Sequence, residues 1–213
     1  MNRIIIACGT LHRELSEVME LCGCTDPVIW LTAGAHNVPQ KRQEEIRKAL
    51  EKCGDYDTVL LAMSFCGNAL VGMESGEHTL VLPRFDDCLY LLRGGRSRPL
   101  DTYYLSEGWL RGRENLLTEY ETAQKKYGGS RADRIFSGML RNYRHMVWLG
   151  TLSSLPDRVQ QFASRFSLEL STETPNLALM VKLLQGRWDS DFLILPPQSK
   201  IKLEMRNGGI SDA

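Results

Sequence analysis

The chain has 213 residues, of which 43% are hydrophobic, and its formal net charge at pH 7 is zero. The balanced charge gives no electrostatic footprint for nucleic acid or an anionic membrane, and no apolar run approaches the roughly 20 residues that span a bilayer. This length predicts one domain, or one domain with a smaller appendage, whose core needs no disulfide framework. We therefore expect a cytoplasmic protein in which cysteines stay reduced.

Strands and helices alternate over the first part of the chain. The predicted strands are residues 3–8, 26–33, 57–65 and 78–85, and the predicted helices between them are residues 10–21 and 37–54. The first apolar stretch is too short for a signal peptide, and Thr10 is the expected cap of the first helix. Units of about 25–30 residues in this order predict a parallel α/β sheet.

The second part of the chain returns to mixed elements. We expect a helical turn at 86–95, a strand into a turn at 101–110, helical structure over 111–141 with a break at Gly128, strands at 145–150 and 191–197, and helices at 155–166 and 174–186. The predicted fold is α/β, with a doubly wound, mostly parallel, Rossmann-like sheet and room for a smaller helical C-terminal lobe.

Composition suggests where the chain divides. Residues 1–110 form an α/β half that carries all the cysteines, residues 111–197 hold a helical segment and returning α/β elements, and residues 198–213 form a loose tail. One continuous domain is the alternative.

The cysteines are unevenly placed. The chain has Cys8, Cys22, Cys24, Cys53, Cys66 and Cys88, and none follows residue 88. Packing alone would not predict this asymmetry, although free cysteine is commonly buried. In a reducing compartment it favours metal binding or thiol chemistry in the N-terminal part.

Four reactive side chains follow the ends of predicted strands. Cys8 ends the first strand, His36 follows the second, Cys66 follows the third and Cys88 follows the fourth. If the strands are parallel, all four lie at the carboxyl edge of the sheet, where open α/β folds bind their ligands.

Soft sulfur ligands select zinc or iron–sulfur clusters. Cys8, Cys66 and Cys88 can hold a four-iron (4Fe-4S) cluster and leave one iron open, since four cysteines are the usual set. Two or three of these thiolates with His36 would instead make a zinc site, able to activate a substrate thiol. The simplest alternative is that the cysteines are only packed.

Other residues at this edge have expected roles. Arg84 would hold an anionic substrate group, or form a surface ion pair with Asp86 or Asp87. Asp87 would orient Arg84 or shuttle a proton, and His36 would be a fourth ligand or a general acid. Close backbone approach and amide donors to a cofactor are expected at Gly9, Gly67 and Asn68.

Several segments together resemble the family called domain of unknown function 1638. They are "IIACGTL", "AHNVP", "SFCGNAL", "LVLPRFDDCLYLLRGG", "TYYLSEGW" and "LLQGRWDSDFLILPP", between residue 4 and about residue 197. The resemblance is most specific at Cys8-Gly9, Cys66-Gly67 and Pro83-Arg84 with Asp87-Cys88; His36, Pro39 and Tyr143 also match. It implies cytoplasmic bacterial and archaeal proteins, many from anaerobes and some found with corrinoid-dependent methyl-transfer systems, and no established reaction.

The leading hypothesis is a metalloprotein with an iron–sulfur centre on Cys8, Cys66 and Cys88. It would use an open coordination position for Lewis-acid or redox chemistry on a small anionic or sulfur-containing substrate, as a lyase, reductase or methyltransferase. One alternative is a zinc-thiolate enzyme of methyl or alkyl transfer linked to corrinoid metabolism. The other is a non-enzymatic partner or chaperone of a corrinoid or methyltransferase protein.

Overall fold

The computed structural model describes residues 2–33, 38–65, 68–112 and 114–202, and the backbone of 204–206 and 209–211. The chain forms two compact units. The first unit comprises Met1–Arg96 and Asn176–Ala213, and the second comprises Ser97–Pro175. The two units are defined by the contacts within each of them. The division expected at residue 110 was based on composition, and it stays a prediction.

A five-stranded sheet in the order β2-β1-β3-β4-β8 forms the centre of the first unit. Its strands are β1 (Arg3–Cys8), β2 (Val28–Leu31), β3 (Thr58–Ala62), β4 (Thr79–Pro83) and β8 (Phe192–Leu195). The first four are parallel, and β8 pairs antiparallel with β4. Every residue of β3 is buried, as its unbroken apolar run predicts for a central strand. The mostly parallel, Rossmann-like α/β fold is thereby confirmed.

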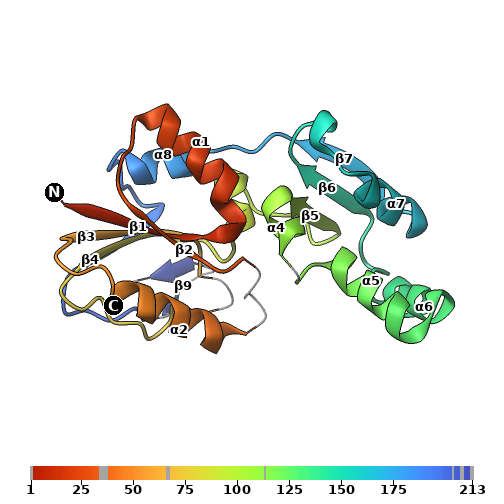
Figure 1. Cartoon of the computed structure of the whole chain (residues 1–213), viewed down its shortest axis with the longest axis horizontal. Coiled ribbons are helices and arrows are strands. Elements are labelled where there is room, and N and C mark those ends of the chain that lie inside the picture. The colour runs from red at the N-terminus through yellow and green to blue at the C-terminus, as the bar shows by residue number, and fades with distance from the viewer. Residues whose placement is uncertain are drawn as a thin grey trace. The chain divides into compact units, whose positions relative to one another are not determined.

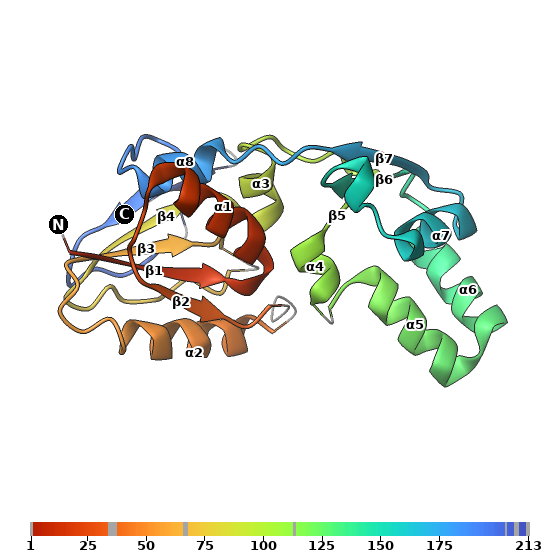
Figure 2. The same cartoon turned by 45° about the horizontal axis from the view of Figure 1, so that its top comes forward.

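Helices cover both faces of this sheet (Figures 1 and 2). They are α1 (His12–Cys22), α2 (Pro39–Leu50) and α8 (Ala178–Leu184), and the short α3 (Cys88–Leu92) lies beyond the carboxyl end of β4. Helices α1 and α8 pack together on one face, and α2 lies on the other. Helix α1 begins later than predicted because a 3-10 turn, η1 (Gly9–Leu11), precedes it; its N-cap is Leu11 rather than Thr10.

The second unit holds a separate parallel sheet in the order β5-β6-β7. Its elements are β5 (Thr102–Ser106), α4 (Glu107–Arg111), α5 (Leu116–Tyr127), α6 (Gly129–Met139), β6 (His145–Leu149), η3 (Leu152–Ser154), α7 (Asp157–Arg165) and β7 (Glu169–Glu173). Strand β7 was not predicted from the sequence. Its residues, ELSTE, are mostly polar and exposed, as an edge strand allows, so no apolar run marks it.

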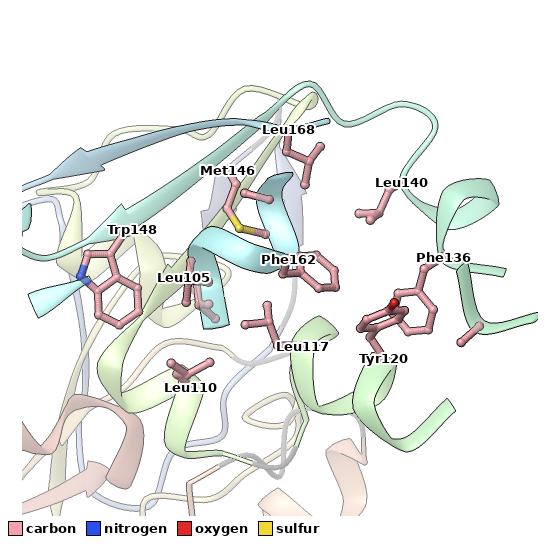
Figure 3. Packing of buried hydrophobic residues seen from close by; sticks show 13 residues of the cluster. Leu105, Leu110, Leu117, Tyr120, Phe136, Leu140, Met146, Trp148, Phe162 and Leu168 are labelled. Atoms are coloured by element: carbon pink, nitrogen blue, oxygen red, sulfur yellow. The ribbon is translucent and has the colours of Figure 1, made fainter. Parts of the chain in front are cut away.

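Aromatic rings form the centre of the second unit's core. Tyr120 of α5 meets Phe136, Phe162 and Phe166 edge-on, with ring centroids 5.2, 5.6 and 5.2 Å away. Figure 3 shows Tyr120 beside Phe136, and Leu117 below Phe162. Such edge-to-face pairs add to the stabilisation from buried area and join three helices of this unit.

The chain leaves the first unit after Arg96 and returns at Asn176. The two connections are joined within the first unit, because the backbone N–H of Asn176 donates to the carbonyl of Leu92 at 2.8 Å. The second unit is therefore an insertion into the first. Beyond β8, β9 (Glu204–Arg206) and β10 (Gly209–Ser211) pair antiparallel within the segment expected to be a loose tail. No helix among the described residues is long and apolar enough to cross a membrane.

The neighbouring residues Ile135 and Phe136 of α6 provide a matched test of the second unit's core. Phe136 is 3% exposed and Ile135 is 39% exposed. We expect Phe136→Ala to lower the free energy of unfolding by about 3–5 kcal/mol, because it removes a buried ring and leaves a cavity. Ile135→Ala should change it by less than about 1 kcal/mol. Urea denaturation monitored by circular dichroism measures both, and equal losses would contradict the described core.

Candidate functional site

The strand order brings the carboxyl ends of β1, β3 and β4 together. β1 pairs in register with β3 from Arg3↔Thr58 to Ala7↔Ala62, and β3 pairs with β4 from Thr58↔Thr79 to Leu60↔Val81. From β1 the chain continues to one side of the sheet, to β2, and from β3 it continues to the other, to β4. This is a topological switch point, and open α/β sheets bind ligands at the carboxyl ends of strands beside such a point.

Two of the predicted thiols lie at the ends of these strands. Cys8 is the last residue of β1 and is fully buried, and its Sγ lies 2.9 Å from Oγ1 of Thr10. Cys88 opens α3, five residues beyond the end of β4, and is 1% exposed. Both sulfurs are therefore shielded from water.

Cys66, Gly67 and His36 lie outside the described residues. The residue before Cys66, Phe65, donates from its backbone N–H to the carbonyl of Phe85 at 3.0 Å, so the segments that follow β3 and β4 are joined. Among the described residues, no three His, Cys, Asp or Glu side chains are close enough to hold a metal ion. That search does not include Cys66 or His36, so the three-cysteine centre stays a prediction.

Backbone geometry limits which residues fit at Gly9 and Asn68. A Cβ at Gly9 would lie 2.7 Å from the carbonyl oxygen of Leu31 and 3.2 Å from the backbone nitrogen of Ala33. Asn68 is exposed and has a φ of 71°, a left-handed conformation that few residues other than glycine adopt. The close approach at Gly9 is to the end of β2, and its expected role in binding a cofactor stays a prediction.

Arg84 and Asp87 make structural bonds at this edge. Nε of Arg84 donates to the carbonyl of Phe192 at 2.9 Å, which ties the end of β4 to β8. The Asp87 carboxylate caps α3 by accepting from the backbone N–H of Leu89 and of Tyr90, at 2.9 and 3.2 Å. Their expected roles toward a substrate stay predictions.

The other thiols lie at the opposite edge of the sheet. Cys22 and Cys24 come just before β2, and Cys53 comes just before β3, so all three are at the amino edge. The Cys53 thiol donates to the carbonyl of Ala49 at 3.3 Å, and burial raises its pKa to about 11. Burial also raises the pKa of Cys24. Burial therefore favours the neutral form of these two thiols, and their place at the amino edge separates them from Cys8 and Cys88.

A family model described as "Protein of unknown function (DUF1638)" matches residues 30–184, more than half of the chain. The chain belongs to the DUF1638 family. The resemblance inferred from the short cysteine motifs is thus confirmed. The matched range includes Cys66 and Cys88, and Cys8 lies before it. No curated protein and no solved structure shows a significant match.

A buried arginine of this DUF1638 protein was missed in the sequence. Arg42, in the first turns of α2, is fully buried; its Nη2 donates to the carbonyl of Thr32 at 2.7 Å, and its Nη1 pairs with Glu45 at 3.0 Å. Its Nε has no hydrogen-bond partner in the described part of the chain. The sequence could have indicated the burial of Arg42 through its helical spacing, because Arg42 lies on the same face of α2 as the buried Ile46 and Ala49.

Two more polar groups at the carboxyl edge were missed. Ser64, just after β3, is fully buried, and its Oγ has no hydrogen-bond partner within the described ranges. His12 opens α1, and its ring packs on Trp30 of β2 with the centroids 4.4 Å apart. The sequence could have indicated that His12 lies at the carboxyl edge, because it comes only four residues after Cys8, which ends β1. The DUF1638 chain therefore gathers more polar chemistry at this edge than its cysteine motifs indicate.

The Cys53 thiol predicts how stability depends on pH. Its folded pKa is raised, so its contribution is complete below the unfolded pKa of about 9 and is lost as pH rises toward about 11, because the unfolded chain releases the proton first. Relative to Cys53→Ala, the unmodified chain should lose unfolding free energy between about pH 9 and 11. Urea titrations at a series of pH values measure this difference, and parallel curves for the two chains would contradict it.

Proposed function

We propose that this DUF1638 protein holds an iron–sulfur cluster on Cys8, Cys66 and Cys88 at the carboxyl edge of the first unit's sheet. One observation carries the proposal: of three neighbouring parallel strands, β1 ends in one of these cysteines, and β3 and β4 are each followed by one. A site at this edge agrees with the general placement of ligands in open α/β sheets.

The described residues fit such a group. Cys8 and Cys88 supply soft sulfur in a dry environment, and burial and hydrogen bonding to sulfur are what tune a cluster's potential. The buried Ser64 hydroxyl has no partner in the ranges described, so it is available to a bound group. Arg42, paired with Glu45, places a buried guanidinium at the same edge, and its Nε has no partner in the described ranges.

Thr10 contacts Cys8, the proposed cluster ligand, and has no proposed role toward the substrate. A thiolate can only accept hydrogen bonds, so once Cys8 is deprotonated, the Thr10 hydroxyl 2.9 Å away becomes the donor. This bond lowers the energy of negative charge on sulfur and orients the ligand.

When bound, a cluster with three cysteine ligands supplies an open iron for Lewis-acid or one-electron chemistry. The substrate is a small anionic or sulfur-containing molecule. Arg84 holds its anionic group, Asp87 keeps Arg84 oriented, and His36 serves as a fourth ligand or proton donor. Involvement with a corrinoid or methyltransferase protein is suggested by the family resemblance.

The proposal is tested by measuring the metal and acid-labile sulfide content of anaerobically purified protein. We expect about four irons and four sulfides per chain. Separate Cys8→Ser, Cys66→Ser and Cys88→Ser substitutions should each remove most of them. The amino-edge substitutions Cys22→Ser and Cys24→Ser are the matched controls and should retain the full content.

Other results would support the alternatives. One zinc per chain, lost in the same three variants, would favour a zinc-thiolate enzyme of methyl or alkyl transfer. If the purified protein is folded but holds no metal, and Cys66→Ser lowers only its stability, both metal proposals are wrong. That result would favour a non-enzymatic partner role.

Thr10→Val tests the hydrogen bond to the Cys8 sulfur. Valine keeps the side chain's shape and removes the donor, so the reduced, more negative cluster loses stabilisation. A loss of about 1 kcal/mol corresponds to a fall of about 40 mV in the one-electron midpoint potential. A redox titration followed by electron paramagnetic resonance measures the shift. Thr25→Val, at the exposed amino edge, is the control, and an unchanged potential in Thr10→Val would exclude the bond.

A further inference from the structure

A groove in the second unit lies outside the site proposed above. Helices α5 and α7 enclose a cavity of about 400 Å³. Each helix contributes four residues with the spacing i, i+3, i+4 and i+7, beginning at Leu117 on α5 and at Arg158 on α7. This spacing defines one face of a helix, so the two lining faces meet across the groove.

The floor of the groove is apolar and already ordered. Leu117, Tyr120 and Phe162 line it, and all three are buried members of the second unit's core. Figure 3 shows Leu117 pointing toward Phe162, with Tyr120 alongside. A ligand's apolar surface would therefore meet a packed surface and would not have to open the core.

Two arginines and one glutamate line the rim of the groove, and each arginine is paired with a carboxylate. Arg158 and Arg165 lie on the same face of α7, about 10 Å apart along its axis. Glu121 on α5 is the acidic residue that lines the groove, and it is 3.8 Å from Arg158, a long ion pair between half-exposed side chains. Such a pair contributes little and does not prevent the guanidinium from meeting another anion.

Arg165 is held in place from behind. Its Nε donates to Oδ1 of Asp133 at 2.7 Å and its Nη2 pairs with Oδ2, so Nη1 takes no part in this pair. The Tyr120 hydroxyl also donates to Asp133, at 2.6 Å. The Arg165 guanidinium, followed by this hydroxyl, lowers the pKa of Asp133 to about 2. Asp133 thus stays ionised and fixes both a floor residue and a rim cation.

Gln161 lies between the two arginines on the lining face of α7. It is exposed, and its side chain makes no hydrogen bond or ion pair in the part of the chain that the structure describes. It is a polar group available to a ligand, and it can be changed without removing a contact of the fold.

We propose that this groove binds a small organic anion with an apolar body, such as an aromatic or alkyl carboxylate or sulfonate. The volume is within the range of small-molecule sites, and the apolar floor with a few polar groups is their usual construction. Burial of the apolar body supplies the driving force, and the arginines of α7 select the anionic group. This site belongs to the second unit and does not depend on the metal centre.

The test compares two dyes with the same rings. The full-length protein is titrated with 8-anilinonaphthalene-1-sulfonate and with its uncharged counterpart, N-phenyl-1-naphthylamine, by fluorescence. We expect one site that binds the sulfonate about fivefold more tightly, since the two guanidiniums, each already paired with a carboxylate, together favour the anion by about 1 kcal/mol. Equal affinities would overturn the proposed preference for anions.

Charge substitutions at Gln161 locate the site. Gln161→Glu should weaken sulfonate binding about fivefold and Gln161→Lys should strengthen it about fivefold, with no change for the uncharged dye. Ser137→Glu, which places the same charge on the exposed face of α6 away from the groove, is the matched control. If both variants at position 161 bind the sulfonate as the unmodified chain does, or if Ser137→Glu matches Gln161→Glu, the groove is not the binding site. Circular dichroism of each variant confirms an unchanged fold.

Discussion

The parallel pairing of β1, β3 and β4 is the constraint on which the first unit depends. Because the strands run in the same direction, the residues after each one emerge at a single edge, and the residues before each one emerge at the other. Strand direction alone assigns Cys22, Cys24 and Cys53 to the amino edge. A slip of β1 by one residue would exchange the faces of Ala7 and Cys8, so the register of β1 against β3, from Arg3↔Thr58 to Ala7↔Ala62, decides on which face the Cys8 side chain lies.

Local sequence predicted most of this fold, and the misses have physical reasons. The central strands carry apolar runs that only burial on two faces explains, and they were placed within a few residues. β7 has no such run because it lies at a sheet edge. The antiparallel direction of β8 depends on its pairing with β4, far away in the sequence. The insertion was hidden because the crossings, marked by Gly94, Gly95 and Pro99 and then by Pro175, look like ordinary turns, and nothing local shows that the chain returns to the first sheet.

The cysteines that end or follow strands were predicted, whereas Arg42 and His12, which lie on helices, and Ser64, which belongs to no motif, were missed. Cys8 and Cys88 could be placed by topology alone. Arg42 resembles the exposed charges around it, and only its helical spacing from Ile46 separates it from Arg47, which is exposed. The groove between α5 and α7 had no sequence signal for the same reason. In the sequence, the arginine and glutamine residues of α7 have the pattern of a solvent-exposed helix face. Only the structure shows that α5 packs opposite this face.

The insertion also has a consequence for synthesis on the ribosome. Between Pro83, which ends β4, and Phe192, which begins β8, 108 residues must be added. At about 5–20 residues per second, the β4 edge therefore waits roughly 5–20 s for its partner, while the second unit emerges complete. An open edge strand is a template for pairing with another nascent chain. Closely spaced ribosomes, or slowly translated codons for residues 84–191, would therefore increase mispairing at the β4 edge and lower the fraction of chains that reach the native state.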